Sequence, residues 1–254
     1  MHGEHGTTPA APAAARARIS LDGVGLVLEA REVLSDLTLE LEFQRLGVVG
    51  RNGSGKSTLA RAIAGLVPPT TGEARLNGHD LAADRGAALR EVGLLFQNPD
   101  HQIIFPTVLE ELAFGLGQLG RKKADAEAEA RATLERFDKL AWAGAATATL
   151  SQGQKHLVCL MAVAAMGPKV LILDEPFAGL DIPTKAQLTR YLALFPGAVI
   201  HISHDPDDLA GSDALLWLER GRIAQVGPGA EVIAAYLEEM QRQGARDDIS
   251  DLPG

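Results

Sequence analysis

The sequence contains few aromatic residues, almost no cysteine, and fewer basic than acidic residues. Aromatic residues make up 4% of the 254 positions, Cys159 is the one cysteine, and the formal net charge is -9. One cysteine excludes a disulfide within the chain and suits a reducing compartment. An acidic composition provides no general basic face for binding nucleic acid, so we expect no nucleic-acid partner.

Long apolar runs are also lacking, which argues against a membrane-spanning helix. The apolar stretch around Cys159 is broken by Gly167 and Pro168. Residues 1–18 are rich in Ala, Pro, Gly and His and lack the apolar centre of a signal peptide, so we expect a disordered leader. Residues 244–254 are expected to form an acidic tail. Residues 19–243 then form one domain, since 46% of the chain is hydrophobic.

A glycine-rich segment follows a short apolar run before residue 50. Residues 50–57 read GRNGSGKS and fit G-x-x-x-x-G-K-[ST], the phosphate-binding loop between a strand and a helix. The backbone N–H groups of such a loop form an anion-binding nest, the lysine neutralises outer phosphates, and the serine can ligate Mg²⁺. A chance glycine-rich turn is the alternative. The residues expected to bind nucleotide are Gly50, Asn52, Gly53, Ser54, Gly55, Lys56, Ser57 and Thr58.

A second candidate element is the apolar run at residues 170–174, which reads VLILD. It predicts a buried parallel strand with Asp174 at its carboxyl end, where ligands bind in open α/β sheets. Asp174 can hold Mg²⁺ directly or through water, and Glu175 can polarise an attacking water. An Asp-Glu pair after a strand is otherwise a helix cap or a solvated turn. The phosphate-binding loop favours the functional interpretation.

The remaining pattern predicts an α/β fold with a mixed sheet and two additions. Residues 19–46 predict antiparallel strands, which form a β subdomain. Residues from about 100 to 166 predict a helical subdomain inserted between sheet strands, with Ala126, Ala130, Leu134 and Phe137 on one helix face. The first helix is expected to end near Leu66. Later elements are expected as helices over 184–194, 206–210 and 231–242, a strand over 198–202 and a hairpin over 214–226.

A candidate helix N-cap at Ser151 and the order of the motifs indicate a known family. Residues 150–154 read LSQGQ, and Ser151 can cap the following helix. The two interpretations are an ordinary helix cap and a second anion site at the helix N-terminus. The chain shows, in order, a phosphate loop, Gln97, a helical insert, LSQGQ, LDEP, Leu180-Asp181 and His204-Asp205. Over residues 19–235 this set resembles the ATP-binding subunit of an ABC transporter.

The resemblance implies a P-loop NTPase of the ABC ATPase type that binds ATP and Mg²⁺ and dimerises head to tail. In such dimers each ATP lies between the phosphate loop of one subunit and the signature segment, here residues 150–154, of the other. The implied catalytic residues are Glu175 as general base, His204 rather than His201 as switch histidine, Gln97 and Lys56. The implied magnesium ligands are Ser57, Gln97 and Asp174. Ser151, Gly153, Gln154 and Asp181 are implied to bind nucleotide or link the two sites across the dimer.

Two positions depart from the family pattern. Gln152 replaces a glycine of the signature segment, which predicts an altered closure of the dimer. Leu28 occupies the place of an aromatic residue that stacks on adenine. An aliphatic side chain offers apolar contact without stacking, so the affinity for ATP is expected to be lower.

Residues 96–102, FQNPDHQ, together with residues 106–108 and 113–115, resemble the energy-coupling-factor class of importers. That class implies a homodimer or related ATPase pair, a transmembrane coupling protein, a small substrate-binding membrane protein, and a peripheral location on the cytoplasmic face of the inner membrane. Asp100, Glu110 and Glu111 are candidates to meet basic residues of the coupling protein.

The transported substrate is inferred from resemblance alone. Residues 150–154, 176–183 and 202–206 are most similar to ATPases of biotin importers, so the predicted function is vitamin uptake with biotin as substrate. Cobalt or nickel import is the nearest alternative within the class. A soluble ABC-type ATPase acting on nucleic acid or ribosomes, and a regulator that does not turn over ATP, are alternatives from other classes.

Overall fold

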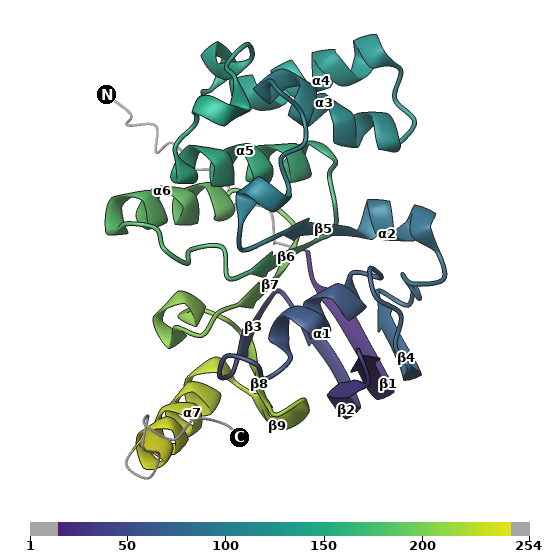
Figure 1. The fold of residues 1–254 in the computed structure, drawn as a ribbon, viewed down its shortest axis with the longest axis vertical. Helices are drawn as coiled ribbons and strands as arrows, with labels where there is room; N and C mark the ends of the chain where they lie inside the picture. Colours follow the sequence, from purple (N-terminus) through teal and green to yellow (C-terminus); the bar gives the residue numbers. More distant parts are fainter. Residues whose placement is uncertain (1–14, 245–254) are drawn as a thin grey trace, which may run out of the picture.

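The computed structural model describes residues 15–244, which form two sheets and a set of helices (Figure 1). One sheet is three-stranded and antiparallel, with the order β2-β1-β4. Its strands are β1 (Ala17–Leu28), β2 (Arg31–Phe43) and β4 (Thr71–Leu76). The predicted β subdomain is therefore present, and because β1 begins at Ala17 the domain starts two residues before the predicted boundary. Most of the predicted leader and tail, residues 1–14 and 245–254, lies outside the described residues.

The second sheet has six strands in the order β5-β6-β7-β3-β8-β9. Its first five strands run parallel, and β9 pairs antiparallel with β8. Residues alternate between two buried faces, as expected for parallel strands covered on both sides: Val170 and Ile172 face one core, Leu171 and Leu173 the other. The strands are β3 (Arg45–Val49), β5 (Val92–Leu95), β6 (Val170–Asp174), β7 (Ala198–Ile202), β8 (Ala214–Glu219) and β9 (Arg222–Gly227).

Helix α1 (Lys56–Ile63) joins the two sheets through one hydrophobic core. Leu59 and Ile63 of this helix share a buried cluster with side chains from both sheets. The helix ends three residues before the predicted Leu66, because Gly65 adopts a left-handed φ of 71°. A short helix, α2 (Arg85–Glu91), follows the antiparallel sheet.

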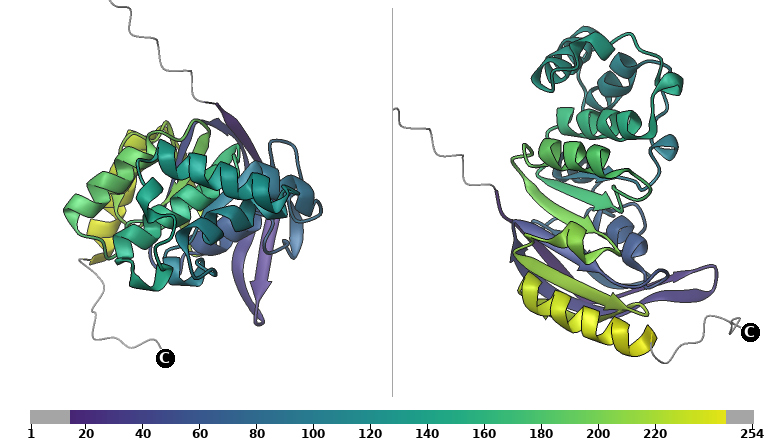
Figure 2. Two further views of the ribbon diagram at one scale, coloured as in Figure 1. Left: turned by 90° about the horizontal axis from the view of Figure 1, so that it is seen from above. Right: turned by 90° about the vertical axis from the view of Figure 1, so that its left-hand side faces the viewer.

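Three helices form the predicted helical subdomain at one end of the molecule: α3 (Val108–Gln118), α4 (Lys123–Arg136) and α5 (Gln152–Ala165). Figures 1 and 2 show them at the opposite end from α7 (Gly229–Gly244). Ala126, Ala130, Leu134 and Phe137 are buried as predicted. Helix α6 (Ile182–Leu192) packs against the six-stranded sheet. Residues Pro206–Leu209 form a single 3₁₀ turn, η4, in place of the helix predicted over 206–210.

The sheet order brings the predicted motifs to one edge. Strand β7 lies between β6 and β3, and all three are parallel. Asp174 ends β6, and the segments that follow the carboxyl ends of the three strands carry Glu175, His204 and the phosphate-binding loop, so these groups lie at one edge of the sheet. Within residues 15–244, no helix has the length and apolar character needed to cross a membrane.

Candidate functional site

The phosphate-binding loop needs its glycines for two different physical reasons. Gly53 and Gly55 have left-handed φ values of 79° and 101°, which cost little only for glycine. Gly50 instead has no room for a side chain, since a Cβ there would lie 2.2 Å from the Leu218 carbonyl oxygen. The loop is braced from outside, because the Gly221 N–H donates to the Ser54 carbonyl oxygen at 2.9 Å. The conformation of the loop is therefore fixed by contacts within the chain.

Lys56 lies inside the curve of this loop. Its side chain is 5% exposed. Its Nζ donates to the Gly50 carbonyl at 2.8 Å and the Arg51 carbonyl at 3.0 Å, and lies 3.8 Å from Glu175 Oε1. Burial lowers the pKa of Lys56, and the carboxylates of Glu175 and Asp174 oppose that shift. The ammonium is thus presented by backbone carbonyls at the position where outer phosphates are expected.

Ser57 and Asp174 form the predicted magnesium pair. The Ser57 hydroxyl donates to Asp174 Oδ1 at 2.9 Å, across a sequence separation of 117 residues. Burial raises the pKa of Asp174, and the hydrogen bond from Ser57 acts in the opposite direction. A hydroxyl and a carboxylate offer the oxygen ligands that Mg²⁺ prefers, with substrate phosphates and waters completing its shell.

Glu175 is held between a lysine and a histidine. His204 Nδ1 lies 2.9 Å from Glu175 Oε2, while Lys56 lies near the other carboxylate oxygen. Glu175 has a left-handed φ of 50°, and its N–H donates to the Ile202 carbonyl at 3.0 Å. A non-glycine residue in this conformation is strained and typical of functional sites. The structure brings His204 to Glu175, and His201 lies instead against Phe177 with ring centroids 5.3 Å apart.

A cavity of about 930 Å³ opens over these groups. Among the predicted residues of the phosphate loop and strand end, Gly50, Ser54 and Asp174 do not line it, and all three are buried. Five lining residues were missed by the sequence reasoning, because they come from the β1–β2 and β8–β9 hairpins and carry no motif. The predicted residues that line the cavity are Asn52, Gly53, Gly55, Lys56, Ser57, Thr58, Gln97, Glu175 and His204, and the additional ones are Arg31, Glu32, Val33, Arg220 and Gly221.

The residues predicted to act across a dimer do not line this cavity. Ser151 and Gln154 form a reciprocal capping box at the start of α5, with distances of 3.3 and 2.8 Å. Asp181 caps α6 by accepting from the Thr184 N–H at 2.8 Å. Gly153 is required for packing, since a Cβ there would lie 2.3 Å from Thr184 Cγ2. The predicted contacts of Ser151, Gly153 and Gln154 are with a nucleotide bound to a second subunit, so these roles stay predictions.

The acidic residues expected to meet a membrane partner have partners within the chain. Glu111 is buried and accepts from the N–H groups of Ile104 and Phe105, each at 2.9 Å. The prediction that Glu111 faces a coupling protein is therefore wrong: the carboxylate satisfies backbone donors in the loop before α3. Asp100 pairs with Lys155 at 2.6 Å, and Glu110 accepts from the Thr107 hydroxyl at 2.6 Å.

Leu28 ends β1 and also does not line the cavity, although the opposing residue in the register, Arg31, does. We expect Leu28→Tyr to tighten ATP binding by about 1 kcal/mol, roughly fivefold, because stacking on adenine would be restored. Calorimetric titration of both proteins with ATP measures this change. Equal affinities would show that residue 28 does not reach the base.

Comparison with known proteins identifies relatives over most of the chain. The family described as ABC transporter matches residues 34–178. The chain is 50% identical over 223 residues to the biotin transport ATP-binding protein BioM of Rhodobacter capsulatus, covering 88% of this chain and 95% of that protein. It is 33% identical over 235 residues to the cobalt import ATP-binding protein CbiO of Syntrophus aciditrophicus, covering 89% and 78%.

A solved structure has the same fold. The structure of cbiO1 from Clostridium perfringens, part of the ABC transporter complex cbiONQ, superposes with a TM-score of 0.73 and 25% sequence identity. The match covers 90% of this chain and 94% of that chain. The two-sheet architecture with an inserted helical subdomain is therefore shared.

Proposed function

Because the chain belongs to the ABC transporter family of ATP-binding proteins, we propose that it powers biotin uptake as the ATPase of an energy-coupling-factor importer. The observation that carries the enzymatic part is the placement of Glu175 between His204 and Lys56 at the mouth of the cavity. The substrate rests on resemblance: identity is 50% with the biotin transport relative and 33% with the cobalt import relative.

Nucleotide binding follows from the shape and charge of the loop. The N–H groups of residues 50–57 and the ammonium of Lys56 neutralise the phosphates, and the dipole of α1 points its positive end the same way. Phosphoryl transfer to water depends on positioning and charge neutralisation more than on covalent chemistry. The cavity that Glu175, His204 and Gln97 line can therefore support hydrolysis once phosphates occupy it.

Each residue around Glu175 has a distinct task in this scheme. Glu175 accepts the proton of the attacking water, and the contact with His204 orients one oxygen of the Glu175 carboxylate. His204 fixes the orientation of that carboxylate. Gln97, which is exposed just after the end of β5, would contact the attacking water and help to hold Mg²⁺.

Magnesium fits the donors that the chain presents. Within residues 15–244 no group of three or more His, Cys, Asp or Glu could hold a metal ion. Ser57 and Asp174 would hold Mg²⁺ jointly with the phosphates, as is usual for this ion. When bound, the ion neutralises charge on the phosphate oxygens.

A second copy of the chain completes the site in this proposal. Ser151, Gly153 and Gln154 lie at the N-terminus of α5, and the capping residues Ser151 and Gln154 are exposed. A helix N-terminus attracts phosphate, so these residues would meet the γ-phosphate bound by the partner subunit. Asp181, which is also exposed, would link the two sites. ATP would then hold two identical subunits together at their interface.

The remaining partners are membrane proteins, which this chain would bind from the cytoplasmic face of the inner membrane. We place a transmembrane coupling protein near the loop after Gln97, where Ile104 is 71% exposed beside the contact of Phe105 with Phe114. A small substrate-binding membrane protein would carry biotin. No residue of this chain needs to touch the vitamin.

Purification of the tagged chain from detergent-solubilised membranes, with mass spectrometry of partners and bound small molecules, tests the proposal. We expect a coupling membrane protein and a small apolar protein that carries biotin. The same two partners with cobalt or nickel would retain the mechanism and change the substrate. Only soluble partners, or RNA, would contradict the transporter assignment and leave the ATP site intact.

A further inference from the structure

The loop that presents His204 is closed on itself by Asp208. The Ser203 hydroxyl donates to Asp208 Oδ2 at 3.0 Å, and the Asp205 N–H donates to Ser203 Oγ at 3.0 Å. The Asp208 N–H also donates to the Asp205 carbonyl at 3.2 Å. Ser203 is therefore bonded to the Asp208 carboxylate and Asp205 to the Asp208 backbone, and only 8% of the Asp208 side chain is exposed.

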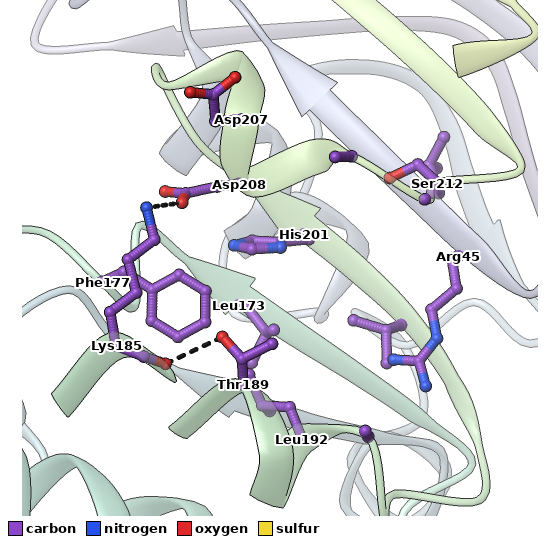
Figure 3. Close-up of a pocket in the computed structure, with 15 residues that line it drawn as sticks. Arg45, Leu173, Phe177, Lys185, Thr189, Leu192, His201, Asp207, Asp208 and Ser212 are labelled. Atoms are coloured by element: carbon purple, nitrogen blue, oxygen red, sulfur yellow. Dashed lines mark hydrogen bonds and ion pairs between the residues drawn. The ribbon is translucent and has the colours of Figure 1, made fainter. Parts of the chain in front are cut away.

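The second oxygen of Asp208 is paired with Lys185 from α6, and Figure 3 shows this ion pair. Lys185 Nζ also lies 3.6 Å from Asp205 Oδ2 and 5.8 Å from the centroid of the Phe177 ring. Asp208 raises the pKa of Lys185, so the lysine is charged at neutral pH. A cavity of about 310 Å³ lies beside the pair, lined by Phe177 and His201 among others. The ion pair thus bridges α6 and the His204 loop.

Helix α6 begins at the segment that carries Asp181. The Lys185 N–H donates to the Asp181 carbonyl at 2.9 Å, so the two residues lie one helical turn apart. Thr184, between them, occupies the space that a side chain at Gly153 would need. The first turn of α6 therefore lies against the signature segment through Thr184 and is paired with the His204 loop through Lys185.

We propose that Lys185 and Asp208 are positioning residues for ATP hydrolysis, which hold His204 against Glu175 and couple it to the start of α6. Neither residue lies in the nucleotide cavity. Because of this pair, the His204–Glu175 contact depends on the positions of Asp181 and the signature segment. A second subunit that binds against Asp181 of this chain would in this way set the position of His204 in this chain.

Steady-state ATPase assays of Asp208→Asn and Lys185→Met test the proposal. We expect each to lower kcat at least about tenfold and to leave KM for ATP within about twofold, because misplacement of a catalytic group costs rate while the phosphate loop is untouched. Lys185→Arg, which keeps the charge, should retain most of the wild-type kcat. In a His204→Ala background, Asp208→Asn should not lower the residual rate further when it is followed with radiolabelled ATP.

Lys169→Met is the matched control, because Lys169 makes a similar bond, 2.5 Å long, to Glu91, a carboxylate that is 5% exposed and belongs to another part of the chain. Its kcat should equal that of the wild type, even where its unfolding midpoint falls as much as in the test variants. An equal loss of kcat in Lys169→Met, an unchanged kcat in the test variants, or a further loss in the His204→Ala background would overturn the proposal. If Asp208→Asn does not fold, the comparison of Lys185→Met with Lys185→Arg decides, since 34% of the Lys185 side chain is exposed.

Discussion

Glu175→Gln lowers the rate of ATP hydrolysis at least about 100-fold, because an amide cannot accept the proton of the attacking water. The substitution keeps the size of the side chain and its contact with His204, which is 2.9 Å long in the wild type. ATP binding and ATP-dependent dimerisation should persist, because the phosphate loop and the signature segment are unchanged. Phosphate release measures the first effect, and size-exclusion chromatography with and without ATP measures the second.

Glu219→Gln is a suitable control for this experiment, because Glu219 is a partly buried acid of β8 that does not line the nucleotide cavity. It should hydrolyse ATP at the wild-type rate. Hydrolysis by Glu175→Gln at that same rate would remove Glu175 from the role of general base. Loss of dimerisation along with hydrolysis would mean that Glu175 acts in nucleotide binding.

Lys56→Ala weakens ATP binding by at least about 2 kcal/mol, roughly 30-fold, because one charge-assisted contact to the phosphates is lost. The change also removes the ammonium that donates to the Gly50 and Arg51 carbonyls, so the loop loses two of its internal hydrogen bonds. Lys56→Arg should not restore binding, since a planar guanidinium does not fit a pocket that leaves the lysine side chain 5% exposed. Isothermal titration with ATP gives both affinities.

The matched control is Lys123→Ala, which removes a 91% exposed lysine from the helical subdomain. Its affinity for ATP should equal that of the wild type. An unchanged affinity in Lys56→Ala would contradict the assignment of residues 50–57 as the nucleotide site. Unfolding midpoints of both variants separate a loss of binding from a loss of folded protein.

Local sequence patterns predicted the core of the site because the motifs sit at strand ends. Once residues 46–49 and 170–174 are assigned to parallel strands of one sheet, Lys56, Asp174 and Glu175 are expected to lie at the same edge of that sheet. The choice of His204 over His201 follows from the same argument, since a residue inside a strand points to a core and the residue after it can reach the edge. The helical subdomain was predicted from apolar spacing alone.

Other features depend on contacts that sequence spacing does not encode. Arg31 and Arg220 reach the cavity because the tips of two separate hairpins pack against the phosphate loop. Glu111 lies beside another acidic residue in the sequence, but the chain turns back so that its carboxylate accepts from two backbone N–H groups. The Lys185–Asp208 pair joins positions that carry no motif of their own. Each requires the tertiary fold to be known first.

Uptake of labelled biotin into liposomes, driven by ATP through the complex that copurifies with this chain, tests the central claim most directly. We expect biotin to accumulate with the wild-type chain, and accumulation to cease when the complex carries Glu175→Gln. The two complexes should contain the same partners in the same amounts. Biotin accumulation that continues with Glu175→Gln, or ATP hydrolysis by the wild-type complex without any biotin uptake, would contradict the account.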